Sequence, residues 1–192
     1  MKKTGKTMTL RGSSPINING SSVFSGELQK NIFSYSSPDQ TRGWILRDAW
    51  AWVAMIDGTG GGDTRVGLTQ CLTTDVLLPN AAGNITGLKD YLQQYSAADN
   101  RTIAWNQQDI HRRDSVNKDF VIPTNAFIDT TKFLHDESRV ITRDLFLNTY
   151  ITTESTTVAT RIDWYIVLEE VELNPTESVM QQIKGIAQSV SS

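Results

Sequence analysis

The sequence contains one cysteine, two histidines and no long apolar run, and each scarcity excludes a class of protein. Because Cys71 has no second cysteine to pair with, an internal disulfide and a zinc site built from several cysteines are both excluded. We expect Cys71 to be a small buried hydrophobic residue in a strand. No stretch approaches the ~20 consecutive apolar residues of a membrane-spanning helix, so the sequence predicts no membrane partner. Residues 1–10 carry lysines without the apolar core of a secretory signal, so the chain is expected to stay where it is made.

The residues that carry most enzyme chemistry are also scarce or scattered. His111 and His135 lie far apart in the sequence, without a partnering cysteine or a glycine-flanked serine to complete a catalytic set. The glycine-rich stretch 57–64 lacks the Lys-Ser/Thr pair of a phosphate loop, and Asp57 and Asp63 supply too few oxygens for calcium. The stretch is therefore interpreted as a flexible hairpin loop. We expect no enzymatic activity, no cofactor and no metal site.

Charge is unevenly distributed along the chain. Residues 1–26 contain four of the 18 basic residues and no acid, which gives +4, whereas the other 14 basic and 21 acidic residues give −7, for the total of −3. A basic segment ahead of an acidic body is suited to contacting a polyanion. We therefore predict that nucleic acid is bound by Lys2, Lys3, Lys6 and Arg11. The alternative is a solvated, frayed terminus, and the apolar alternation within Thr7–Phe24 also allows an edge strand.

One strong strand pattern runs from Arg42 to Ile56. Large apolar residues occupy even positions, among them Trp44, Trp50 and Trp52, and smaller or charged residues occupy odd positions. This period of two is typical of a strand with one buried face, so we expect the three tryptophans to form a wall of the core. A tryptophan ladder that binds sugars is the alternative interpretation.

The carboxyl-terminal third carries the clearest strand signal. Two segments, 140–150 and 159–173, alternate apolar and polar residues and are rich in β-branched and aromatic side chains. The sequence predicts that the two segments pair as an antiparallel hairpin. Glu169 and Glu170 interrupt the alternation before Val171 resumes it out of phase, and this interruption predicts a β-bulge.

Weaker patterns fill the rest of the chain. Short strands are predicted over 28–35, 66–72 and 100–105. Leu88–Tyr95 has helical spacing, which predicts a short helix inserted in a loop. The stretch 107–137 is polar and irregular, and we interpret it as a long loop.

The end of the chain changes period. Asn174 and Glu177 form a capping-box arrangement at the start of a helix that carries an apolar stripe. We therefore predict an all-β fold, an antiparallel β-sandwich of single jelly-roll type with a short loop helix and a C-terminal helix. An immunoglobulin-like sandwich is the alternative. The expected parts are a basic N-terminal arm (1–26), the jelly-roll sandwich (27–173), and a C-terminal amphipathic helix and tail (174–192).

Motifs near the carboxyl end resemble a known family. The motif Arg143-Asp144-Leu145-Phe146-Leu147, the run from Asp163 to Val171 and the following 177–188 segment are similar to the carboxyl end of single jelly-roll capsid proteins. These are the capsid proteins of small circular Rep-encoding single-stranded DNA viruses, including smacovirus-like relatives. The resemblance extends more weakly to Arg42-Gly43-Trp44 and to 72–75.

The resemblance implies a structural function. A capsid protein of this family would self-assemble into an icosahedral shell of about sixty copies, or a multiple of sixty. The shell would enclose viral single-stranded DNA, the chain would be located in the virion, and it would be no enzyme. Because the arm holds only four basic residues, retention of a genome would depend on many copies acting together. A non-viral β-sandwich binding module, lectin-like or cytokine-like, is the alternative.

Overall fold

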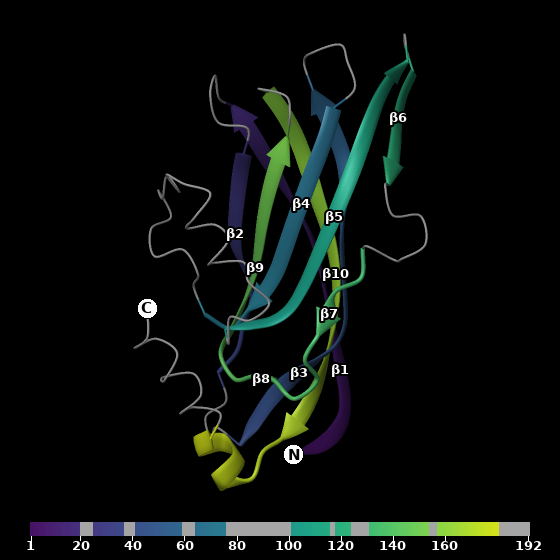
Figure 1. Cartoon of the computed structure of the whole chain (residues 1–192). Helices are drawn as coiled ribbons and strands as arrows, with labels where there is room; N and C mark the ends of the chain where they lie inside the picture. Colours follow the sequence, from purple (N-terminus) through teal and green to yellow (C-terminus); the bar gives the residue numbers. More distant parts are fainter. Residues whose placement is uncertain are drawn as a thin grey trace.

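The computed structural model describes residues 1–19, 25–36, 41–58, 64–75, 101–115, 118–123, 131–153 and 157–180. These residues form two antiparallel β-sheets that face each other (Figure 1). The four-stranded sheet contains, in spatial order, β1 (Lys2–Asn19), β10 (Thr157–Glu172), β3 (Arg42–Gly58) and β8 (Val140–Ile141). The six-stranded sheet contains β2 (Ser25–Ser34), β9 (Asp144–Thr153), β4 (Thr64–Thr73), β5 (Thr102–Ser115) and β6 (Lys118–Pro123), with β7 (Leu134–His135) paired to β5.

The order of the strands identifies the fold as a jelly roll. Along the chain, β1, β3, β8 and β10 belong to one sheet, whereas β2, β4, β5 and β9 belong to the other. Apart from the successive pairs β4–β5 and β5–β6, the chain crosses repeatedly between the sheets, as two wrapped Greek keys do. The prediction of an all-β, single jelly-roll sandwich is confirmed, and a short helix follows β10 over residues 175–180.

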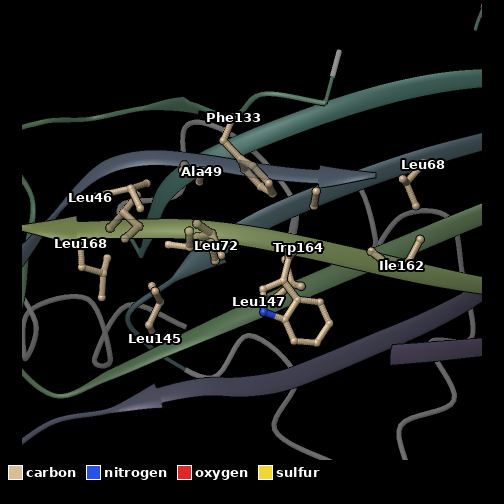
Figure 2. Packing of buried hydrophobic residues seen from close by; sticks show 14 of the residues in the cluster. Leu46, Ala49, Leu68, Leu72, Phe133, Leu145, Leu147, Ile162, Trp164 and Leu168 are labelled. Atoms are coloured by element: carbon tan, nitrogen blue, oxygen red, sulfur yellow. The ribbon is translucent and has the colours of Figure 1, made fainter. Parts of the chain in front are cut away.

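Side chains from both sheets form the hydrophobic core (Figure 2). Trp164 and Ile162 of β10 belong to the same buried cluster as Leu72 of β4 and Leu147 of β9. Ile162, Leu72 and Leu147 are completely buried. Burying a side chain of this size contributes about 1.5–3 kcal/mol, so this shared core is the main force that holds the two sheets together.

The amino-terminal segment is part of the sandwich. β1 pairs with β10 along its length, from Lys2 opposite Glu172 to Asn19 opposite Thr157. It lies at the edge of the four-stranded sheet, which confirms that this segment supplies an edge strand. The division of the chain into parts at residues 26 and 173 stays a prediction.

The predicted hairpin between 140–150 and 159–173 is wrong. β9 pairs with β2 and β4 in one sheet, whereas β10 pairs with β1 and β3 in the other. Both strands show period-two alternation because each has one face on the shared core. Alternation identifies such a strand but does not identify its neighbours.

The predicted bulge at Glu169 and Glu170 lies at the right place but in the wrong strand. The pairing of β10 with β3 is regular there, whereas β1 carries extra residues between Lys3 and Thr7. Gly5 within this bulge has a φ of 80°, a conformation that glycine adopts without steric cost. Beyond Glu170 the burial pattern changes because Val171 packs in a second cluster, with Ile45, Val140 and Leu173.

The three tryptophans of β3 do not form one wall of the core. Trp44 packs at the edge of the main cluster, but Ala49 and Ala51 are the completely buried residues further along the strand. A register shift opposite Val167 and Leu168 leaves an extra residue in β3 and reverses the faces of the residues after Leu46. Trp50 and Trp52 are therefore half-buried on the outer face of the sheet.

The interpretation of 107–137 as one long loop is also wrong. β5 continues to Ser115, β6 and β7 follow it, and Lys132 pairs with Trp50 of β3. Ile110 and Phe133 of this stretch are buried in the core, whereas the first inward residue, Gln108, is polar and is buried through hydrogen bonds. Gln108 Nε2 donates to the carbonyl oxygen of Ala51, 2.7 Å away in the opposite sheet, and also lies 3.2 Å from Asn106 Oδ1.

Cys71 is buried in β4, as predicted. The predicted helix at 88–95 lies outside the described residues.

Candidate nucleic-acid interface

The four predicted nucleic-acid-binding residues all lie on the edge strand β1. Each of them is exposed: Lys2, Lys3, Lys6 and Arg11. The antiparallel pairing places the beginning of β1 beside the end of β10, which is rich in acids. The basic segment and its nearest acids are therefore brought together by the sheet: Glu169, Glu170 and Glu172.

Two of the lysines are paired with glutamates of β10. Lys3 Nζ lies 2.8 Å from Glu169 Oε2, and Lys6 Nζ lies 3.4 Å from Glu170 Oε2. The lysine side chains are 64% and 66% exposed, so each pair contributes about 1 kcal/mol or less. The positive charge that these lysines offer to a polyanion is partly cancelled by their partners.

Glu170 is the centre of a polar network at this end of the sheet. Its Oε2 accepts a hydrogen bond from Thr4 Oγ1 at 2.9 Å, and Arg42 Nη1 lies 3.8 Å from its Oε1. The hydrogen bond from Thr4 and the charges of Lys6 and Arg42 lower the pKa of Glu170 below its ordinary value of 4.5, although burial opposes the shift. The charged carboxylate therefore ties the bulged start of β1 to β10.

The start of the chain also contacts the helix that follows β10. The amino group of Met1 pairs with Glu177 Oε1. Glu177 Oε2 accepts a hydrogen bond from the Asn174 backbone N–H at 3.0 Å, and the Glu177 N–H donates to Asn174 Oδ1 at 2.8 Å. The predicted capping box is confirmed. Figure 1 shows the N-terminus and this helix at the same end of the molecule. The bond to the amino terminus, followed by the bond to Asn174, lowers the pKa of Glu177.

Arg11 has different surroundings from the lysines. Its guanidinium carbon lies 5.2 Å from the centroid of the Tyr165 ring, an arrangement that permits a cation–π interaction. In the part of the chain that the structure describes, no carboxylate lies within ion-pair distance of Arg11. Arg11 therefore presents a positive charge that no carboxylate of the described residues pairs with.

The sequence analysis placed Trp50 and Trp52 in the core, with a sugar-binding ladder only as the alternative, but both belong to an aromatic surface next to Arg11. Trp50, Trp52, Tyr165 and Thr131 line a shallow hollow of about 310 Å³ on the outer face of the four-stranded sheet. The adjacent polar residues Arg47 and Asp48, which break the alternation after Leu46, are the signal that could have revealed the change of face. Lys132 comes from the stretch interpreted as a loop, so sequence could not place it beside Trp50.

Three other features bear on function: metal ligands, membrane-spanning helices and the basic pair Arg112 and Arg113. Within the described ranges, no group of three histidine, cysteine, aspartate or glutamate side chains is placed to hold a metal ion. Across those same residues, no helix has the length and apolar character to span a bilayer. Arg112 and Arg113 belong to β5, and their side chains lie outside what the structure describes.

Comparisons with known proteins find similarity in structure but not in sequence. No model of a protein family matches the chain, and no curated protein matches it. Among solved structures, the chain is similar to one from the semi-empty virus-like particle of the giant freshwater prawn Macrobrachium rosenbergii nodavirus, at 16% identity and a TM-score of 0.36, covering 88% of this chain and 96% of that chain. It is also similar to a chain of desmodium yellow mottle tymovirus, at 14% identity and a TM-score of 0.28, covering 89% and 93% of the two chains. At these values, the functional interpretation has to rest on the residues of this chain.

Proposed function

We propose that this protein is a viral capsid protein, a structural subunit that self-assembles into a closed shell around single-stranded nucleic acid. The observation that carries the proposal is the jelly-roll order of the strands, together with the resemblance of the 143–147 and 163–171 motifs to jelly-roll capsid proteins. A fold alone does not determine a function, so the proposal also needs a surface for self-association.

We infer that exposed apolar side chains take part in such contacts. Val179 and Met180 on the helix are 53% and 54% exposed, and Leu134 of β7 is 66% exposed. Contacts with neighbouring copies would remove these side chains from water, at a gain of about 25 cal/mol for each Å² of apolar surface. We infer an icosahedral arrangement of about sixty copies, or a multiple of sixty, because closed symmetric assembly uses the same contacts repeatedly.

The genome and its contacts belong to the same proposal. The resemblance favours single-stranded DNA, and the chain would be located in the virion. Lys2, Lys3, Lys6 and Arg11 would contact phosphates through charge alone. Because Lys3 and Lys6 already have carboxylate partners, we expect Arg11 and Lys2 to contribute more per residue. Repetition over a closed shell would compensate for the weak contact made by each copy.

Two measurements on expressed full-length protein test the proposal. Size-exclusion chromatography with light scattering should find closed particles, and monomers or dimers at every salt and protein concentration would contradict shell formation. Replacing Lys2, Lys3, Lys6 and Arg11 with glutamine should leave particles intact but lower their ratio of absorbance at 260 nm to that at 280 nm. Unchanged nucleic-acid content would mean that residues outside β1 bind the nucleic acid.

A lectin-like binding module is the second candidate, and the aromatic hollow favours it. Trp50, Trp52 and Tyr165 line the hollow with aromatic rings, the kind of group on which sugars stack. Binding of a glycan by a chain that stays monomeric would favour this function over a shell.

A further inference from the structure

Four residues form a row across the outer face of the four-stranded sheet. Arg11 of β1 pairs in register with Tyr165 of β10, Tyr165 pairs with Trp50 of β3, and Trp50 pairs with Lys132. Side chains of residues paired in this way lie on the same face of a sheet. The row therefore reads cation, aromatic ring, aromatic ring, cation.

The rings and the cations of the row are in contact. The centroids of the Trp50 and Tyr165 rings are 5.6 Å apart, with the planes tilted by 55°. Arg11 lies 5.2 Å from the Tyr165 centroid, and Lys132 Nζ lies 5.5 Å from the Trp50 centroid. Two backbone hydrogen bonds hold the segment that carries Lys132, from Ala51 N to Thr131 O and from Phe133 N to Ala49 O, both at 2.9 Å. The row is therefore built into the sheet rather than into a loose loop.

The hollow beside the row is open to solvent and has room for a planar ligand. It is lined by Trp50, Tyr165, Trp52 and Thr131, and its volume of about 310 Å³ is at the lower end of the ~300–1,000 Å³ range for small-molecule sites. Trp50, Trp52 and Tyr165 are all half-buried, so part of each ring remains accessible. An exposed aromatic hollow of this size can receive one or two flat rings at a time.

Each end of the row carries a cation, Arg11 at one end and Lys132 at the other. Lys132 Nζ lies 2.9 Å from Asp48 Oδ1, so part of its charge is cancelled. Among the residues that the structure describes, no carboxylate forms an ion pair with Arg11. The row therefore presents positive charge on a chain whose net charge is −3.

We propose that this outer face is a stacking platform for single-stranded nucleic acid. Unpaired bases would stack on Trp50 and Tyr165 in the hollow, while Arg11 and Lys132 at the two ends of the row would contact phosphates. Aromatic rings combined with cations bind single strands without sequence preference, because every base offers a π-face. A neutral sugar would use the rings but would gain little from a cation at each end. The inference rests on the proposed function, since a shell protein has to contact its genome.

Binding of a fluorescent oligothymidylate by the unassembled full-length chain tests the platform directly. The double variant Trp50→Leu/Tyr165→Leu should bind roughly five- to 150-fold more weakly than the unmodified chain, the range expected for losing a stacked base. Tyr35→Leu is the matched control, because Tyr35 is also a half-buried aromatic residue, stacked on Phe33 away from the row. Its affinity should stay within about twofold of the unmodified value.

A second set of variants distinguishes a loss of binding groups from a loss of folding. Trp50→Phe keeps a ring at this position and should retain most of the affinity, whereas Trp50→Leu should not. Arg11→Gln should reduce the log-log salt slope of binding by roughly 0.7, the value for one phosphate on a single strand. Arg143→Gln, which removes an exposed arginine between β8 and β9, should leave the slope unchanged.

Three results would overturn the platform. The first is oligothymidylate affinity that stays the same in Trp50→Leu/Tyr165→Leu. The second is Trp50-dependent binding of a neutral oligosaccharide together with no binding of oligothymidylate. The third is loss of particle assembly in the double variant with oligonucleotide affinity unchanged, which would make the face a contact between copies. Because oligonucleotide binding and assembly are measured separately, failure of the platform is distinguishable from failure of the shell.

Discussion

Gly12 lies in β1 directly opposite Trp164 of β10, and the indole ring occupies the space that a larger residue would need. A Cβ atom added at Gly12 would lie within 2.8 Å of three ring atoms, Cζ2, Cε2 and Cη2. Cβ atoms are essentially never found within 3.0 Å of such neighbours, so Gly12→Ala requires movement of the ring or of the strand. Trp164 is only 5% exposed and belongs to the main core, which leaves the ring little freedom to move.

Overpacking of a buried site costs about 1–3 kcal/mol, and the depth of this overlap places Gly12→Ala near the upper limit of about 3 kcal/mol. In a chain of this size, each kcal/mol lowers the melting temperature by about 2–4 °C, so a decrease of about 6–12 °C is expected. Thermal unfolding of the unassembled chain followed by circular dichroism measures it. Thr9→Ala, at an exposed position on the same strand, is the control and should change stability by about 0.5 kcal/mol or less.

A double-mutant cycle tests the contact itself. Trp164→Leu removes the ring that the new methyl group would meet, so Gly12→Ala should cost less in the Trp164→Leu background. We expect a coupling energy of about 2 kcal/mol, within the range for residues in direct contact. If Gly12→Ala has no effect, or if the two substitutions are additive, Gly12 does not pack on Trp164. The segment would then be a frayed terminus, the alternative that its charge allows.

Three further predictions concern polar contacts. Gln108→Leu should cost about 1–3 kcal/mol in denaturant unfolding, because the carbonyl of Ala51 loses its donor in the opposite sheet. The pKa of Glu170 is lower in the folded chain than its ordinary value of 4.5. The charged carboxylate therefore stabilises the fold fully above pH 4.5, and this stabilisation is lost as the pH falls through the folded-state pKa. The stability difference between the unmodified chain and Glu170→Gln should therefore shrink in acid, and a constant difference would contradict this assignment. Asn174→Ala should destabilise the helix start by about 1 kcal/mol, because it removes the acceptor for the Glu177 N–H, and hydrogen exchange at residues 175–180 should accelerate.

The strands and the core residues of the last third could be predicted from sequence. Alternation in β9 and β10 reports one buried face, and Leu147 and Ile162 are completely buried as that pattern requires. The capping box could be predicted because Asn174 and Glu177 are three residues apart and interact locally. The assignment of β9 and β10 to different sheets could not, because sheet membership is decided by distant partners.

The site could be predicted only in part, for two physical reasons. The basic residues of β1 are visible in the sequence, but the acid that pairs with Lys3 is 166 residues away and is brought near only by the sheet. The extra residue in β3 after Leu46 turns Trp50 outward, and a bulge of one residue leaves a weak signal in the sequence. The strand β5 was not predicted beyond residue 105 because its inward residue Gln108 is polar, which breaks the apolar alternation. Gln108 is buried through hydrogen bonds rather than apolar packing.

Electron microscopy of the expressed full-length chain, negatively stained, tests the proposed shell most directly. We expect closed particles of uniform diameter that contain nucleic acid and are built from jelly-roll subunits. A field of single subunits without closed particles, in a preparation whose circular dichroism shows folded β-sheet, would contradict it.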